Sequence, residues 1–145
     1  MFESRSPRNF NSAPQSVTAF IATVLEPAIT VSLLDGQHPR MGEGVFRVRD
    51  DDRSETLIFN DTLFNHPHAT GFGGVMLRVM GSSGGPKVTP LFRAVGGADK
   101  ARFAAHLRHL GTRPNLSHLV PGHGLPVDLD PGGVLRDVAD RLSPR

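Results

Sequence analysis

The sequence predicts one domain of the α/β or α+β class, because stretches with strand character are followed by segments with helical character. A buried strand is expected over residues 29–34, a β-branched apolar run that ends at the Asp35-Gly36 turn. Residues 45–48 and 56–59 flank an acidic tip at residues 50–52, which indicates the two strands of a hairpin. Three strands are therefore expected before residue 60.

A helix, a strand and a second helix are predicted in that order after residue 98. Residues 99–110 carry apolar side chains at helical spacing, and Gly111 provides a C-terminal stop. Residues 116–120 indicate a short strand, which is broken by Pro121-Gly122. Asp130-Pro131 is typical of a helix start, with aspartate as N-cap and proline at the first helical position. The positions expected to face the core are Phe103, Leu107, Leu110, Val134, Val138 and Leu142.

The chain length indicates a single compact domain. With 145 residues, of which 38% are hydrophobic, the chain can bury one modest core and is too short for two independent ones. Residues 1–12 show no periodicity and are expected to form a flexible arm, so that the domain comprises residues 13–145. A helix is expected to start just before Pro14 and to end at Pro27.

The composition excludes several classes of site. The chain has no cysteine, which excludes disulfides, thiolate zinc sites, iron–sulfur clusters and a cysteine nucleophile. The net charge is only +2, the basic residues are dispersed, and Trp and Tyr are absent, so nucleic-acid binding is not expected. No apolar run reaches the roughly 18 residues of a membrane span, and the N-terminus lacks a signal-peptide core. We therefore expect a soluble cytoplasmic protein without a membrane partner.

Two strand ends carry side chains suited to metal binding. An apolar strand leads to Asp61, and a later strand delivers His123 into a turn between Gly122 and Gly124. Sites in α/β folds usually form at the carboxyl ends of strands. A carboxylate and an imidazole together suit zinc, iron or manganese, and ligands that are far apart in sequence need only meet in space.

Both motifs resemble the C-terminal half of a metallo-β-lactamase-fold hydrolase. In that superfamily an apolar strand ends in an aspartate that bridges two metals, and a later Pro-Gly-His-Gly turn supplies the last histidine ligand. Asp61 and His123 match those two positions. Residues 33–127 are also similar to one branch of the superfamily, in which an Asn-Asp-x-Leu-Phe-Asn motif precedes a Gly-Ser-x-Gly-Gly-Pro loop. Here the matching segments are residues 60–65 and 81–86, followed by the predicted helix and the His-Gly turn.

The resemblance implies a truncated half of an αββα sandwich, with a mixed sheet and helices on one face. The superfamily's His-x-His-x-Asp-His motif, which supplies most of the first metal site, does not occur in this chain. The nearest string is His66-Pro67-His68, which follows Asp61. Side chains two positions apart in an extended segment point to opposite sides, so at most one of these histidines is expected to join Asp61 and His123, with His68 preferred. Alternatively, two chains pair and complete a site across their interface.

Each candidate also has an ordinary structural interpretation. His123 would be a turn histidine held by the backbone, and Asp61 would cap the amides that follow its strand. His66 and His68 would be loop residues, and His118 would be a packing or surface residue of its strand.

Residues 60–97 are rich in glycine and are expected to form a long loop with one or two short helices. Within it, residues 81–87 superficially resemble a phosphate-binding loop. A Walker A loop needs glycine before its lysine and Ser or Thr after it, whereas Pro86 and Val88 occupy those places. Lys87 and the loop amides retain a looser role, in which they steer an anionic or polar substrate over the site.

These features predict a small metal-dependent hydrolase of ester-like bonds, with a phosphoester, phosphotriester or lactone as substrate. Asp61, His123 and either His66 or His68 would hold zinc or a similar ion, whose bound water ionises near neutral pH and attacks the substrate. As a metal-bound carboxylate, Asp61 would also accept a proton. The alternative is a non-catalytic remnant of the same fold that acts as a structural or binding domain. An uncovered apolar sheet face further predicts a homodimer or a larger homo-oligomer.

Overall fold

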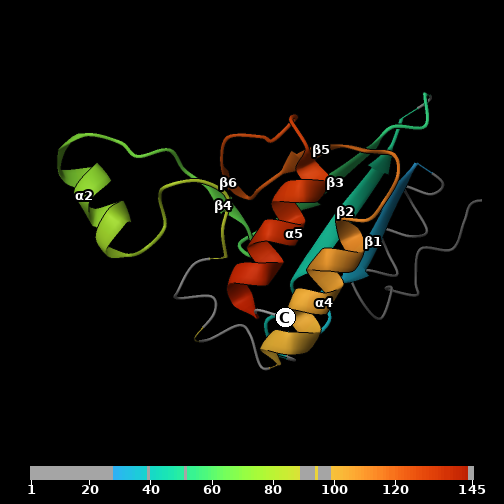
Figure 1. The fold of residues 1–145 in the computed structure, drawn as a ribbon, viewed down its shortest axis with the longest axis horizontal. Helices are drawn as coiled ribbons and strands as arrows, with labels where there is room; N and C mark the ends of the chain where they lie inside the picture. Colours follow the sequence, from blue (N-terminus) through green and yellow to red (C-terminus); the bar gives the residue numbers. More distant parts are fainter. Residues whose placement is uncertain (1–27, 39, 51, 89–93, 95–98, 144–145) are drawn as a thin grey trace, which may run out of the picture.

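The computed structural model describes residues 28–38, 40–50, 52–88, 94 and 99–143. These residues form a mixed four-stranded sheet, a two-stranded sheet and three helices (Figure 1), which confirms the predicted α+β class. The arm expected over residues 1–12 and the helix expected between Pro14 and Pro27 lie outside the described residues. Within the described part of the chain, no helix combines the length and the apolar character needed to cross a membrane.

The large sheet has the strand order β1-β2-β3-β5, and the small sheet pairs β4 with β6. In chain order the elements are β1 Ile29–Leu33, β2 Gly44–Arg49, β3 Glu55–Phe59, β4 Phe64–Asn65, α2 Gly71–Val79, α4 Lys100–Leu110, β5 Leu116–Val120, β6 His123–Gly124 and α5 Pro131–Leu142. Neighbouring strands of the large sheet are antiparallel except β3 and β5, which run parallel. This one parallel pair makes the sheet mixed.

The predicted hairpin is confirmed as β2 and β3. Val45 pairs with Phe59 at its open end. At the turn, Asp50 donates its backbone N–H to the carbonyl of Ser54 over 3.0 Å, and the Asp52 carboxylate accepts the Ser54 N–H over 2.8 Å. Apolar alternation and a turn rich in aspartate specify this element locally.

The prediction that the first strand is buried is wrong. β1 lies at the edge of the large sheet, and its residues are half-buried or exposed, with Leu33 56% exposed. The buried side chain is Leu34, one residue beyond the strand. A β-branched apolar run favours a strand but does not determine whether that strand lies at the centre or at the edge of its sheet.

Helices α4 and α5 begin where the capping residues predict. Asp99 accepts a hydrogen bond from the backbone N–H of Arg102 over 2.9 Å, and Gly111 follows the last residue of α4. Asp130 accepts the N–H of Gly133 over 2.8 Å, with Pro131 in the first helical position. The two helices pack against each other and lie on one face of the large sheet (Figure 1).

The core lies between these two helices and the sheet. The predicted core positions Phe103, Leu107, Leu110, Val138 and Leu142 are buried, whereas Val134 is only partly buried. The buried residues of α5 start at Pro131 and continue with Leu135, Val138, Ala139 and Leu142, a helical spacing along one face. Leu135 therefore takes the buried position that was predicted for Val134.

The opposite face of the large sheet is apolar, and no described helix covers it (Figure 1). Successive residues of a strand point to opposite faces, so the fully buried Val45, Leu57 and Leu119 mark the helix side. The half-buried apolar residues of the other side are Ile29, Val31, Phe46, Val48, Ile58 and Val120, and Thr56 and His118 lie on the same side. We call this the open sheet face.

The described part of the expected loop region contains one helix, α2, which stands apart from both sheets (Figure 1). Its one buried residue is Gly74, and the side chains of Phe72 and Val79 are exposed. The region also contains β4, which was not predicted. A strand of two residues carries too little pattern to be detected in a sequence.

Candidate functional site

The parallel pairing of β3 with β5 places two loops side by side, at the end of the large sheet where both strands have their carboxyl termini. Ile58 pairs with Val120, so the residues that follow these strands leave the sheet at the same end. Asp61 follows β3 and His123 follows β5. The Oδ1 atom of Asp61 lies 3.0 Å from the Nε2 atom of His123. The structure therefore brings together the two residues that the sequence motifs selected.

Both side chains of this pair are accessible from solvent. The side chain of Asp61 is 58% exposed and that of His123 is 50% exposed. Phe64 packs against the His123 imidazole with 4.5 Å between the ring centres. The imidazole is thus held by a carboxylate at Nε2 and by an aromatic ring on its face, while a ligand can still reach it.

Two glycines allow the His123 turn to approach neighbouring backbone. A Cβ atom on Gly122 would lie 2.1 Å from the carbonyl oxygen of Asn60. A Cβ atom on Gly124 would lie 2.1 Å from the carbonyl oxygen of Asn65, and Gly124 also has a φ of +98°. The Gly-His-Gly sequence is therefore a steric requirement of the turn that delivers His123 to Asp61.

His66 is the second histidine near the pair. It follows β4, and its ring centre lies 6.3 Å from that of His123 and 6.1 Å from that of Phe64. Its backbone carbonyl accepts the N–H of Gly84 over 2.8 Å, which joins the glycine loop to β4.

His68, the histidine that the sequence preferred, has partners other than Asp61 and His123. The Nδ1 atom of His68 lies 3.2 Å from the Ser83 hydroxyl and 3.2 Å from Nε of Arg78. A guanidinium has only N–H donors, so Nδ1 accepts, and the Ser83 hydroxyl donates as well. Neither partner belongs to the Asp61–His123 pair, and the spacing of the histidines alone did not reveal these contacts.

Glu43 is a residue of this region that the sequence did not indicate. It is only 8% exposed and lies beneath the loop that carries Asp61. Its carboxylate accepts hydrogen bonds from the Thr62 hydroxyl over 3.4 Å and from the Asn60 amide over 3.5 Å. Burial raises the pKa of Glu43 above its ordinary value of 4.5, and the negative charge of Asp61 raises it further.

Gln37 fixes the backbone of Glu43. Its side-chain oxygen accepts the N–H of Glu43 over 2.8 Å, and its amide nitrogen donates to the Glu43 carbonyl over 2.5 Å. The sequence signal was the position of Glu43 between Gly42 and Gly44 before a strand, which by itself does not distinguish a buried carboxyl from an exposed one.

The described residues hold no group of three or more His, Asp or Glu side chains arranged to bind one metal ion. His118, the fifth candidate, lies at the surface, where its Nδ1 atom is 2.8 Å from Oδ1 of Asp128. The site therefore consists of the Asp61–His123 pair, with His66 and Phe64 beside it and Glu43 beneath it.

Comparisons with known proteins assign no family to this chain. No protein-family profile matches it, and no curated protein sequence matches it.

The glycine contacts predict the effect of adding one methyl group. We expect Gly122→Ala to lower the free energy of unfolding by about 2 kcal/mol or more, because the new Cβ meets backbone that cannot rotate away. Gly73→Ala in α2 is the control, since a Cβ there meets nothing within 4 Å. Urea denaturation measures both. Equal stabilities of the two variants would contradict the close approach at Gly122.

The buried Glu43 carboxyl predicts a dependence of stability on pH. Because the pKa of Glu43 is raised, the folded state binds the carboxyl proton more tightly than the unfolded state does. The stability that Glu43 contributes is therefore complete below pH 4.5 and is lost as the pH rises through the raised pKa. Glu43→Gln cannot ionise, so the wild type should lose stability relative to this variant as the pH rises from 4.5 through the raised pKa of Glu43. Urea denaturation across that range tests this, and parallel stability curves would refute it.

Proposed function

We propose that the Asp61–His123 pair is the centre of a metal-dependent hydrolase built on half of a metallo-β-lactamase-like sandwich. The observation that carries the proposal is the 3.0 Å approach of Asp61 Oδ1 and His123 Nε2 at the carboxyl edge of two parallel strands. In α/β folds, ligand-binding sites lie at the carboxyl ends of the strands. The substrate is a small molecule with an ester-like bond, for which phosphoester, phosphotriester and lactone are the candidates.

The architecture supports the half-sandwich part of the proposal. Two helices cover one face of a mixed sheet, and the other face is apolar and carries no described helix (Figure 1). In an αββα sandwich, that second face packs against another sheet. The open sheet face is the surface on which such a partner sheet would lie.

The donor types at the site fit a divalent transition metal. Zinc takes histidine nitrogen and aspartate oxygen as ligands, and catalytic zinc sites use three protein ligands with one open position. Asp61 and His123 supply one oxygen and one nitrogen that face each other, and the ring centre of His66 lies 6.3 Å from that of His123. We propose these three as the ligands for zinc or for a similar ion such as iron or manganese.

A bound divalent metal would supply an ionised water near neutral pH. The roles of the chain's own residues follow from their contacts. Phe64 packs on the His123 ring and limits its rotation. Glu43 holds the loop of Asp61 from below through Thr62 and Asn60. The exposed carboxylate of Asp61 would be placed to accept a proton from a water at the site.

The second candidate function is that of a non-catalytic structural or binding domain on the same half-fold. The observation that favours it is the lack of a third convergent ligand within the described residues. In that case the Asp61–His123 contact is an exposed side-chain hydrogen bond that joins two loops.

Variants of the pair distinguish the two functions. If the site is catalytic, purified protein contains stoichiometric metal by elemental analysis, and Asp61→Asn and His123→Ala each lower ester hydrolysis by at least about a hundredfold. Nitrophenyl phosphodiester, phosphotriester and lactone substrates cover the proposed classes.

The matched control is the other surface pair of the same kind, His118 and Asp128, at 2.8 Å. His118→Ala and Asp128→Asn should leave metal content and hydrolysis unchanged. A wild type without stoichiometric metal, together with activity that His123→Ala leaves intact, would reject the hydrolase and support the binding domain.

We also propose that two copies pair through the open sheet face, because an apolar sheet surface of this kind is normally covered. Light scattering at micromolar concentration should give at least twice the 15.6 kDa of one chain. Phe46→Glu should reduce the mass to that of a monomer, whereas Ala105→Glu on the exposed side of α4 should not. A monomeric wild type would overturn this proposal.

A further inference from the structure

A cavity of about 340 Å³ lies between the glycine loop and the C-terminal half of α5, outside the Asp61–His123 site. The loop side is formed by Pro86, Lys87 and Val88, and the helix side by Val138, Arg141 and Leu142. Small-molecule sites in proteins start at about 300 Å³, so the cavity has the volume of a site for a small ligand.

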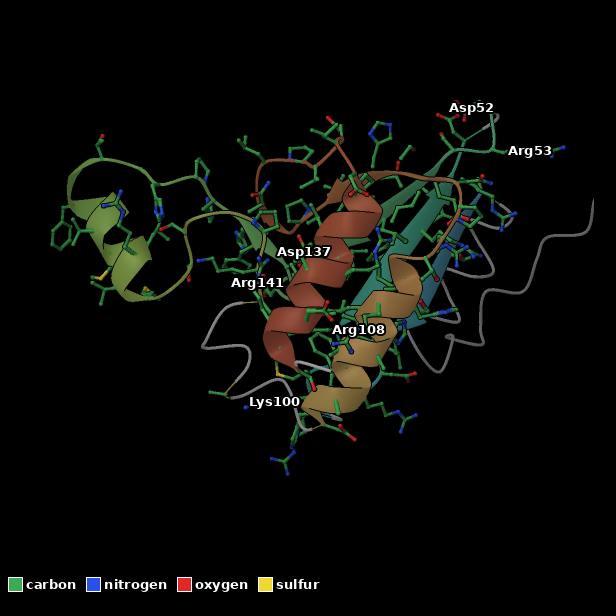
Figure 2. All side chains as sticks on the ribbon, viewed as in Figure 1. Asp52, Arg53, Lys100, Arg108, Asp137 and Arg141 are labelled. Atoms are coloured by element: carbon green, nitrogen blue, oxygen red, sulfur yellow. The ribbon has the colours of Figure 1, made fainter. Side chains whose placement is uncertain are left out.

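Two cationic side chains line this cavity, and both are bound to neutral groups. The ammonium of Lys87 donates to the backbone carbonyl of Ser83. The guanidinium of Arg141 reaches across from α5 and donates to the carbonyl of Pro86 over 2.7 Å (Figure 2). Neither takes part in the ion pairs of the described residues, and the described lining contains no Asp or Glu. Their positive charges are therefore available to an anion.

The described lining also includes three apolar side chains that belong to the core. Val88, Val138 and Leu142 are at most 8% exposed, so the methyl groups that they turn to the cavity are held in place by packing. Such a wall does not bind a fully hydrated ion such as free phosphate well, because apolar surface gains nothing from contact with it. It suits the apolar body of an organic anion.

The loop side is fixed before any ligand binds. Lys87 and Phe64 exchange two backbone hydrogen bonds, of 2.9 and 3.0 Å, which join the loop to β4. The backbone N–H of Ser82 donates to the carbonyl of Leu77 over 2.8 Å at the start of the loop. A site held in this way does not lose backbone entropy when it binds.

We propose that this cavity binds a small organic anion, with an oxyanion head group between Lys87 and Arg141 and a short apolar chain against Val88, Val138 and Leu142. An arginine can bind a carboxylate or a phosphate with two parallel hydrogen bonds, and a lysine adds a point charge. The site goes beyond the proposed hydrolase and does not depend on it, since none of these residues belongs to the metal site.

Proton–nitrogen NMR of the full labelled chain tests this with hexanoate and hexyl phosphate as probes, and with hexanol as a neutral chain of the same length. We expect saturable shifts of the amides around Lys87 and Leu142 with at least one anion. Lys87→Gln and Arg141→Gln should each weaken this binding about tenfold, because each removes a charged hydrogen-bond donor. Glutamine keeps an amide that can bind the same backbone carbonyl.

Lys100→Gln, at an exposed position of α4, is the matched control and should bind like the wild type. Asp61→Asn should also bind like the wild type, which separates this site from the metal site. The proposal is overturned if neither anion gives saturable shifts. It is also overturned if hexanol binds as well as the anions, or if both glutamine variants of the cavity bind with wild-type affinity.

Discussion

The parallel pairing of β3 with β5 is the constraint on which the candidate site depends. These strands are separated by more than fifty residues in the chain, yet their register fixes where both following loops leave the sheet. Once the strands are paired, Gly122 lies against the backbone of Asn60, and Gly124 lies against that of Asn65. The contact between Asp61 and His123 is then a consequence of backbone geometry, and no long flexible side chain is needed to make it.

Two buried carboxyls in this protein, Glu55 and Glu43, differ in the groups that bind them and in the direction of their pKa shifts. Glu55 is 7% exposed and receives two hydrogen bonds from Arg113, of 2.5 and 2.8 Å, which hold the pKa of Glu55 below its ordinary value. Glu43 is as deeply buried, but the described residues give it only neutral donors, and its pKa is raised. A buried carboxyl without a cation destabilises a fold. The hydrogen bonds that Glu43 accepts from Asn60 and Thr62 on either side of Asp61 indicate that Glu43 positions that loop.

The parts of the fold that could be predicted are those with local signals. The aspartates at residues 99 and 130 cap their helices, and the acidic turn between β2 and β3 closes a hairpin, because these contacts join residues only a few positions apart. The strand-end motifs also correctly selected Asp61 and His123 as neighbours. What could not be predicted depends on distant partners. Glu43 is buried by a loop nearly twenty residues away, and His68 is bound by Ser83 and Arg78.

Whether Asp61 and His123 bind a divalent metal together is tested most directly by histidine-ring nitrogen NMR. Stoichiometric zinc added to the labelled protein should shift the Nε2 resonance of His123 to the range of a metal-bound imidazole. The same zinc should leave the ring of His118 unchanged, although His118 forms a similar pair with Asp128. The shift at His123 should be lost in Asp61→Asn. An Nε2 resonance of His123 that does not respond to zinc, or that responds no more than that of His118, would contradict metal binding by the pair.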